Sequence, residues 1–295
     1  MAGKFLQAVV AILLWLAASD VGHAQDETGR NPARIVSLAP HLTELAFEAG
    51  IGDLLVGAVE WSDHPAAARE IPRIGDAFRF DLERILRMDA SHALAWRGGT
   101  PSGAVAKLRE LGIEVEVIET RTLEQIAGAI ERLGQLGADP AAAAERAADF
   151  RRRLLAFEQG VPSGRPVVEI FYQVSEKPLF TLGGNHVINE VFGLCGAANV
   201  FDRMQTEAAS VDLEAVLARD PLAIVASDDG AGNPAAHWQA YPDLRAIACD
   251  NVLRVDPALL VRPTPRVLDG AAKLCEWLDR EVRPAENPAC RTDRD

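Results

Sequence analysis

"DPAAAAERAADFRRRLLAFEQG" (139–160) is the stretch that decides how the rest of the chain is organised. Asp139 can cap a helix and Pro140 suits its first position. From Ala141 to Gln159 there is no Gly or Pro, and these 19 residues would form a rod of about 28 Å at 1.5 Å per residue. Strand and helix patterns continue on both sides, so the helix is expected to be a stiff connector between two lobes.

The segment before the connector alternates between short apolar strands and amphipathic helices. The expected strands are 34–38, 54–60, a run ending at Trp96, and 114–118. The expected helices are 40–50, one from Asp81, about 101–111, and about 122–136. Such alternation predicts a mostly parallel sheet that helices cover on both faces.

The segment after the connector has the same alternation. Strands are expected at 167–172, 222–227 and 252–256, with helices near 186–194 and 265–281. The predicted fold class is therefore α/β, with two lobes of mostly parallel sheet flanked by helices and joined by one long connector helix. The N-terminal lobe is assigned to 34–138, the connector to 139–160, and the C-terminal lobe to 165–283.

The two lobes share a sequence pattern. "DLERILRMDASHALAW" (81–96) aligns with "DLEAVLARDPLAIVAS" (212–227) at an offset of 131 residues. Two unrelated helix–strand units can resemble each other by chance, but the identical Asp-Leu-Glu start at one offset favours an internal duplication. Two similar lobes would face each other across a cleft.

The N-terminus predicts an exported protein. Lys4 precedes the apolar run 5–18, and Gly22-His23-Ala24 has small residues at the spacing of a cleavage site, so 1–24 is expected to be a signal peptide and the protein periplasmic. The formal net charge of −13 argues against nucleic acid as a partner. A monomer in solution is expected.

The cysteine count agrees with export. Four cysteines are present, at 195, 249, 275 and 290. An even number in an exported chain favours disulfides, and the sequence alone allows three pairings.

Sequence signatures of several enzyme classes are missing. There is no Gly-x-Ser-x-Gly, His-Glu-x-x-His or Gly-Lys-Ser/Thr motif, and "GAGNPA" (230–235) is interpreted as a turn rather than a nicotinamide site. No histidines form a ligand pair at helical spacing, so no metal site is expected; His41 and His64 are the candidates because of their loop or helix-start positions.

Aromatic residues are expected at the strand ends where α/β proteins bind ligands. Trp61, Trp96 and Tyr172 each end or follow a predicted strand, and Arg97 and Gly98 follow Trp96. An aromatic residue at a strand end is often only a lid on the core. Three of them beside an arginine favour a ligand with broad apolar faces and a polar rim, which glycine backbone can approach closely.

Four stretches of the sequence resemble a known family: "RIVSLAPHLTELAFEAGIG" (34–52), "WSDHP" (61–65), "DLERI" (81–85) and "AWRGG" (95–99). With the spacing of Cys195 and Cys275, they are similar to the periplasmic cobalamin-binding proteins of cobalamin ABC importers. The resemblance covers nearly all of 34–281. It implies a non-enzymatic carrier with no cofactor, in which a corrinoid, cobalamin, is the transported ligand and the ABC permease dimer is the partner.

The resemblance also implies roles for particular residues. It implies ligand contacts by Trp61, Trp96 and Arg262, with Phe78 standing in for a family tryptophan that falls on Ala77. It implies a Cys195–Cys275 disulfide, leaving Cys249 and Cys290, and permease docking by Glu83 and Glu214.

The second lobe departs from the family pattern. A family tryptophan falls near Ala208, and the aspartate partner of the arginine falls on Ala258. A haem or iron–siderophore carrier of the same fold is therefore an alternative. An exported metal-dependent hydrolase is the alternative of another class, against which the lack of a clustered nucleophile, base and metal set argues.

Overall fold

The computed structural model describes residues 32–162, 164–230, 232–284 and 290. The predicted signal peptide, 1–24, lies outside these residues. Among the described helices, none is both long and apolar enough to cross a membrane.

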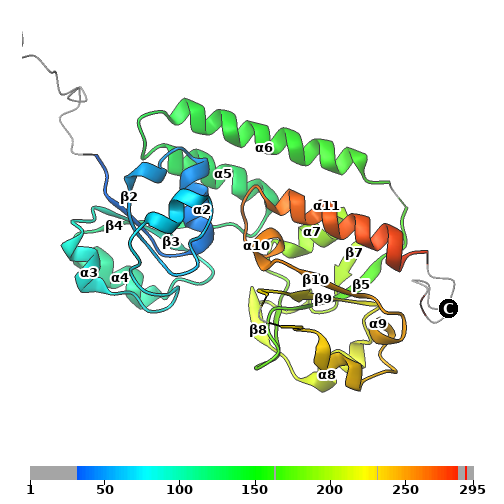
Figure 1. Ribbon diagram of the computed structural model, residues 1–295. Coiled ribbons are helices and arrows are strands. Elements are labelled where there is room, and N and C mark those ends of the chain that lie inside the picture. Colours follow the sequence, from blue (N-terminus) through cyan, green and yellow to red (C-terminus); the bar gives the residue numbers. More distant parts are fainter. Residues whose placement is uncertain (1–31, 163, 231, 285–289, 291–295) are drawn as a thin grey trace, which may run out of the picture. The chain divides into compact units, whose positions relative to one another are not determined.

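The N-terminal lobe is built on a four-stranded parallel sheet with the order β2-β1-β3-β4. Its strands are β1 (Ile35–Ser37), β2 (Leu55–Ala58), β3 (His92–Trp96) and β4 (Glu114–Ile118). Helices α2 (Pro40–Glu48) and α5 (Leu123–Gly134) share a core with one face of the sheet, whereas α3 (Leu82–Arg87) and α4 (Ser102–Glu110) share a core with the other (Figure 1). Burial on both faces explains why these strands are apolar runs rather than alternating patterns.

The C-terminal lobe has a second parallel sheet with the order β10-β9-β5-β7. Its strands are β5 (Val168–Gln173), β7 (Ala197–Asn199), β9 (Ala223–Ser227) and β10 (Val252–Val255). Helices α7 (Ile188–Leu194) and α11 (Val267–Trp277) lie on one face, and α8 (Leu213–Arg219) and α9 (Arg245–Ala248) on the other. The two-lobed α/β fold class predicted from the sequence is confirmed.

The two sheets have the same connectivity. Counted along the chain within each lobe, both sheets have the strand order 2-1-3-4. In the first sheet Ile35 lies opposite His92, and in the second Ile170 lies opposite Ala223. His92 and Ala223 are 131 residues apart, which is the offset of the aligned sequence stretches. The topology therefore supports the duplication hypothesis.

The connector is the helix α6 (Pro140–Gly160), capped by the Asp139 side chain, which accepts a hydrogen bond of 3.0 Å from the Ala142 amide. Ala143, Ala147 and Phe150 form its buried stripe and recur at the spacing of one helix face. This stripe packs along α5. Arg151 joins the same two helices by ion pairs to Glu124 and Glu131, each at 2.6–2.7 Å.

One apolar core runs through both lobes. The cluster that contains α2, α5 and the α6 stripe also contains α7, α11 and the inner face of the second sheet. The lobes are therefore joined by packing as well as by the connector.

The remaining elements are short. They are η1 (Gly52–Leu54), η2 (Ala66–Glu70), β6 (Phe180–Leu182), β8 (Ala208–Ser210), η3 (Ala236–Ala240), α10 (Pro257–Leu260) and η4 (Leu278–Val282). Strands β6 and β8 pair antiparallel and form a small sheet of their own. Neither strand, nor β7, was predicted, because three residues are too few to show a period. The equally short β1 was predicted only as part of the longer run 34–38.

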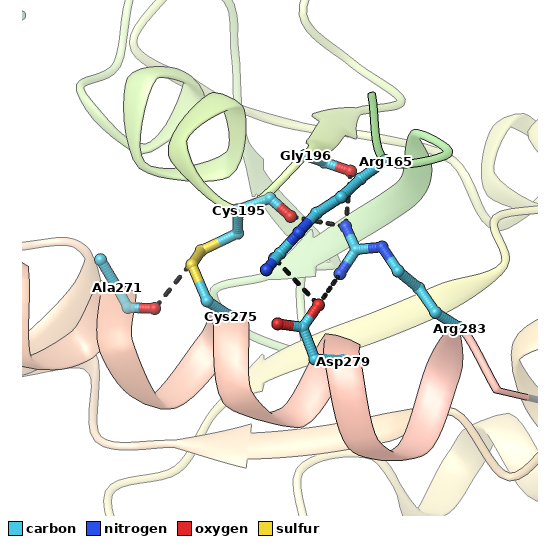
Figure 2. The surroundings of a disulfide bond; sticks show 7 residues. All are labelled: Arg165, Cys195, Gly196, Ala271, Cys275, Asp279 and Arg283. Carbon is cyan, nitrogen blue, oxygen red and sulfur yellow. Dashed lines mark hydrogen bonds and ion pairs between the residues drawn. A yellow bond between two sulfur atoms is a disulfide. The ribbon is translucent and has the colours of Figure 1, made fainter. Parts of the chain in front are cut away.

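Two disulfides hold the C-terminal lobe together. Cys195 at the end of α7 is bonded to Cys275 of α11, the pairing that the family resemblance implied, and Cys249 is bonded to Cys290. Figure 2 shows that the first bond lies beside a charged cluster in which Asp279 accepts from Arg283 at 2.7 Å and pairs with Arg165 at 2.9 Å. The Cys195 carbonyl accepts from Arg283, so covalent and polar contacts fix the same end of α7.

Candidate functional site

The residues that meet between the lobes lie on segments that follow strand carboxyl ends. In the N-terminal lobe, His41 follows β1, Asp63 follows β2, Trp96 ends β3 and Arg121 follows β4. In the C-terminal lobe, Glu207 follows β7 and Arg262 follows β10 of the parallel sheet, and His186 follows β6 of the small antiparallel sheet. We call these seven residues, with Trp61 and Phe78, the carboxyl-end face. Ligands of open α/β sheets bind at this edge.

Trp61 and Phe78 are the most exposed large apolar side chains of the described residues, at 72% and 69%. Trp61 also has a φ of +65°, which is uncommon for a residue with a bulky side chain. Backbone strain of this kind clusters at functional sites. Both rings are placed where a ligand can cover them.

Trp96 is partly buried and packs against His41. The two rings meet edge to face, with centroids 5.3 Å apart and an interplanar angle of 86°. The Trp96 amide donates to the Thr100 hydroxyl at 2.8 Å. A Cβ on Gly99 would lie 2.1 Å from the Trp96 ring, so this glycine makes room for the tryptophan.

The structure corrects the role predicted for Gly98. A Cβ on Gly98 would fall about 2.0 Å from the Glu207 carboxylate of the other lobe. The glycine therefore admits a protein side chain here, rather than leaving space open for a ligand. Arg97, beside it, lies 3.7 Å from the Glu119 carboxylate and is half exposed.

Three ion pairs join the lobes at or next to this face. Arg262 Nη1 lies 2.6 Å from the Asp63 carboxylate. Arg121 Nε lies 3.0 Å from the carboxylate of Glu207. Arg266, at the start of α11, donates two hydrogen bonds of 2.7 and 2.6 Å to the Glu44 carboxylate of α2. Each pair takes its arginine from one lobe and its carboxylate from the other.

The protonation of these groups follows from burial and pairing. Partial burial opposes ionisation of Asp63, but the hydrogen bond and charge of Arg262 lower the pKa of its carboxyl below the ordinary value. The hydrogen bonds that Arg266 donates to Glu44 raise the pKa of its guanidinium. Asp63 and Arg266 are therefore fully charged at neutral pH.

His41 is a neutral imidazole on this face. Burial, with smaller effects from Arg262 and His186, lowers its pKa to about 3. Its Nε2 atom is buried without a hydrogen-bond partner. Burial also lowers the pKa of His186 to about 4. His64 is half buried in the loop that follows Trp61, and among the described residues no group of three or more His, Cys, Asp or Glu side chains could hold a metal ion.

The prediction that Tyr172 lines the ligand face is wrong. Its ring is fully buried, and its hydroxyl lies 2.9 Å from the Ser227 hydroxyl. Strand β5 continues one residue further, to Gln173, and is covered on both faces, so the tyrosine packs on Phe192 inside the core.

The two glutamates predicted to dock a permease occupy equivalent places. Glu83 in α3 and Glu214 in α8 are both exposed and both stand second in their helices. Glu83 lies 3.6 Å from Arg87, one turn further along α3.

Hollows in the structure lie beside this face and elsewhere. One of about 310 Å³ opens next to Trp96 and Arg97 and runs along α4 to Arg109. A larger one, of about 820 Å³, lies between α5, α6 and α7 and reaches Arg165 and Gly196, at the amino ends of β5 and β7. All residues that line the first hollow belong to the N-terminal lobe. We place the site at the carboxyl ends of the strands, which Trp96 and Arg97 mark, because ligands of this architecture bind there.

Sequence reasoning missed the carboxylates that pair with the arginines. Asp63 and Arg262 are 199 residues apart, and Glu44 and Arg266 are 222 apart. Asp63 stands within the quoted "WSDHP" stretch and Glu44 within the quoted stretch 34–52, which were the available signals. Glu207 carries no local pattern.

These features define a class of protein. The chain belongs to the periplasmic binding protein family, whose model matches residues 35–239. It is 39% identical over 247 residues to the vitamin B12-binding protein of Vibrio cholerae serotype O1, covering 83% of this chain and 88% of the relative.

Solved structures agree with this relationship. The periplasmic vitamin B12 binding protein BtuF of Vibrio cholerae has a TM-score of 0.76 and 39% identity, over 84% of this chain and 97% of that one. The periplasmic heme binding protein HutB of Vibrio cholerae, at 22% identity and a TM-score of 0.70, covers 84% and 99% and shows the fold alone.

Proposed function

We propose that this protein binds a corrinoid, cobalamin, between its two lobes and delivers it to an ABC importer. The observation that carries the proposal is the exposure of two large aromatic side chains, Trp61 and Phe78, in the segment that follows the carboxyl end of β2. The names of the relatives at 39% identity support the corrinoid as the ligand.

The arrangement suits binding without covalent chemistry. Aromatic rings offer a broad apolar surface, and Trp96 extends it toward the core. Removing about 500 Å² of apolar surface from water would contribute roughly 12 kcal/mol at 25 cal/mol/Å². Association costs on the order of 4–15 kcal/mol, so with added polar contacts a micromolar to nanomolar affinity is expected.

The remaining parts of the proposal concern location and partners. Residues 1–24 would direct export and be removed, leaving a periplasmic protein whose lobes span 34–138 and 165–283. Glu83 and Glu214 would each meet one half of a permease dimer. Trp61, Phe78, Trp96, Arg97 and Arg262 are the proposed ligand contacts.

A titration tests the ligand. Adding cobalamin should quench tryptophan fluorescence, and Trp96→Ala should weaken binding by about 1–3 kcal/mol, the scale for one large buried apolar contact. Trp277→Ala, in α11 of the other lobe, is the matched control and should leave the affinity unchanged. Equal affinities for wild type and Trp96→Ala would remove this residue from the site.

The absorbance spectrum of protein purified from its native host distinguishes the corrinoid carrier from the alternative functions. Cobalt corrinoids, haem and ferric siderophores absorb differently, and a hydrolase would carry none of these bands. A haem spectrum would replace the proposal with the haem-carrier alternative.

A further inference from the structure

The arginines of the carboxyl-end face are already neutralised by the protein. Arg262 pairs with Asp63 at 2.6 Å, and Arg121 pairs with Glu207 at 3.0 Å. Glu207 is only 11% exposed and Arg262 only 19%. Arg121 also lies 3.3 Å from Glu119, which lies 3.7 Å from Arg97. A ligand that enters between the lobes therefore meets one ion pair and one cluster of two arginines and two glutamates, each with a net charge of zero.

The partners come from opposite lobes, so a ligand lying between the lobes approaches both charges of a pair. A carboxamide carries two N–H donors and an oxygen acceptor, and it can bond to arginine and carboxylate at once. A carboxylate has acceptors only. It would compete with Asp63 or Glu207 for the arginine and leave two negative charges side by side, which costs free energy.

We propose that Asp63 and Glu207 are specificity-determining residues, which keep the arginines of the ligand face neutral so that the site accepts a macrocycle with uncharged amide side chains and rejects one with carboxylates. This inference rests on the proposed function, because it selects among macrocycles that fit between the lobes. Rejection of a competitor through an unfavourable charge is a common route to specificity.

Two corrinoids that differ in one group test the inference. The probes are cobalamin and a cobalamin monocarboxylate, in which one side-chain amide has been hydrolysed. Wild type should bind the amide form at least about tenfold more tightly, and the ratio should shrink as NaCl is raised, because salt screens the repulsion. Asp63→Asn, which removes the charge and keeps the shape, should bring the two affinities to within about threefold.

Asp149→Asn is the matched control. It removes one carboxylate from an exposed pair with Arg152 on the connector, so it changes the net charge equally but should leave the discrimination of wild type intact. Glu207→Gln is the second variant and should also reduce the discrimination. Thermal unfolding verifies that each variant is folded. If Asp63→Asn does not fold, the discrimination measured for Glu207→Gln tests the inference in its place.

Each remaining outcome is decisive. Equal binding of both corrinoids by wild type overturns the inference. It is also overturned if the ratio of the two affinities changes equally in Asp63→Asn and in Asp149→Asn. If wild type binds neither corrinoid, the proposed function fails. Hemin, which carries two propionates, then decides the inference: tighter binding by Asp63→Asn than by wild type supports it, and no gain overturns it.

Discussion

At the residue scale, Glu44 is the buried charge on which the stability of the protein depends most. It is 1% exposed in α2, and both of its oxygens accept from Arg266. A buried carboxylate that loses its partner is strongly destabilising. Arg266→Met should therefore lower the free energy of unfolding by about 3–5 kcal/mol, measured by urea denaturation.

The control is Arg280→Met in the same lobe. Arg280 also pairs with a glutamate, Glu276, but both side chains are more than half exposed. An exposed pair contributes about 0–1 kcal/mol. Similar losses for the two variants would mean that burial of Glu44 is unimportant.

His41 predicts how stability depends on pH. Its folded pKa is about 3, because burial is reinforced by Arg262 and His186, whereas the unfolded value is near 6.5. Below about pH 6.5 the His41 imidazole binds a proton in the unfolded chain but stays neutral in the folded protein. His41 therefore makes stability fall as the pH drops from about 6.5 towards 3, by up to about 1.4 kcal/mol per pH unit.

His41→Asn removes this contribution. Urea unfolding at a series of pH values from 7.5 to 4.5 should show a steeper loss for wild type than for the variant. His186 acts in the same direction in both proteins, since burial lowers its pKa too, and so cancels in the comparison. Parallel curves would show that His41 is protonated in the folded state.

Local sequence predicted some site residues and not others. Trp96 and Trp61 were placed at strand ends because an apolar run stops there. Tyr172 was misplaced, since a strand buried on both faces gives no sign of which residue ends it. Asp63 and Glu207 pair with arginines in the other lobe, and apart from the "WSDHP" stretch around Asp63 no local pattern contains that information.

At the scale of elements, α6 depends on the stripe that it buries. Phe150 is 1% exposed and lies in the core shared with α5, whereas Leu155, five residues later, is 54% exposed. Phe150→Ala should cost about 3–5 kcal/mol of unfolding free energy. Leu155→Ala should change it by less than about 0.5 kcal/mol. Denaturant unfolding of both variants compares them, and similar losses would contradict the packing.

The longer helices were predicted well because their signals are long and chemically distinct, whereas the four-residue helices α9 and α10 were not predicted. The connector was bounded to within a residue by Asp139 and Pro140 at its start. The start of α3 was predicted by Asp81, whose side chain accepts from the Arg84 amide. Strands β6, β7 and β8 were missed because their pairing depends on the rest of the fold rather than on their own three residues.

At the scale of the whole molecule, the repeated topology bears on the docking proposal. Glu83 and Glu214 occupy equivalent places in two lobes of the same connectivity. Acidic residues in a first helical turn are stabilised by the helix dipole by only about 0.3–1 kcal/mol. The double variant Glu83→Ala/Glu214→Ala should therefore keep its ligand affinity and most of its stability, but lose ligand-dependent transport.

A double variant of the connector provides the comparison. Glu145 and Glu158 are exposed glutamates on α6, so their replacement by Ala removes the same charge from another surface. Uptake of labelled cobalamin by cells should fail for the first pair and persist for the second. Full uptake by Glu83→Ala/Glu214→Ala would leave these glutamates with no role beyond their interaction with the helix dipole.

The shared strand order also makes the difference between the lobes visible. The position that holds Trp96 at the end of β3 holds Ser227 at the end of β9, 131 residues on. One half offers a flat indole, and the other a hydroxyl already bonded to Tyr172. A disc-shaped ligand held between two such different surfaces would bind in one preferred orientation, with one of its faces always against the N-terminal lobe.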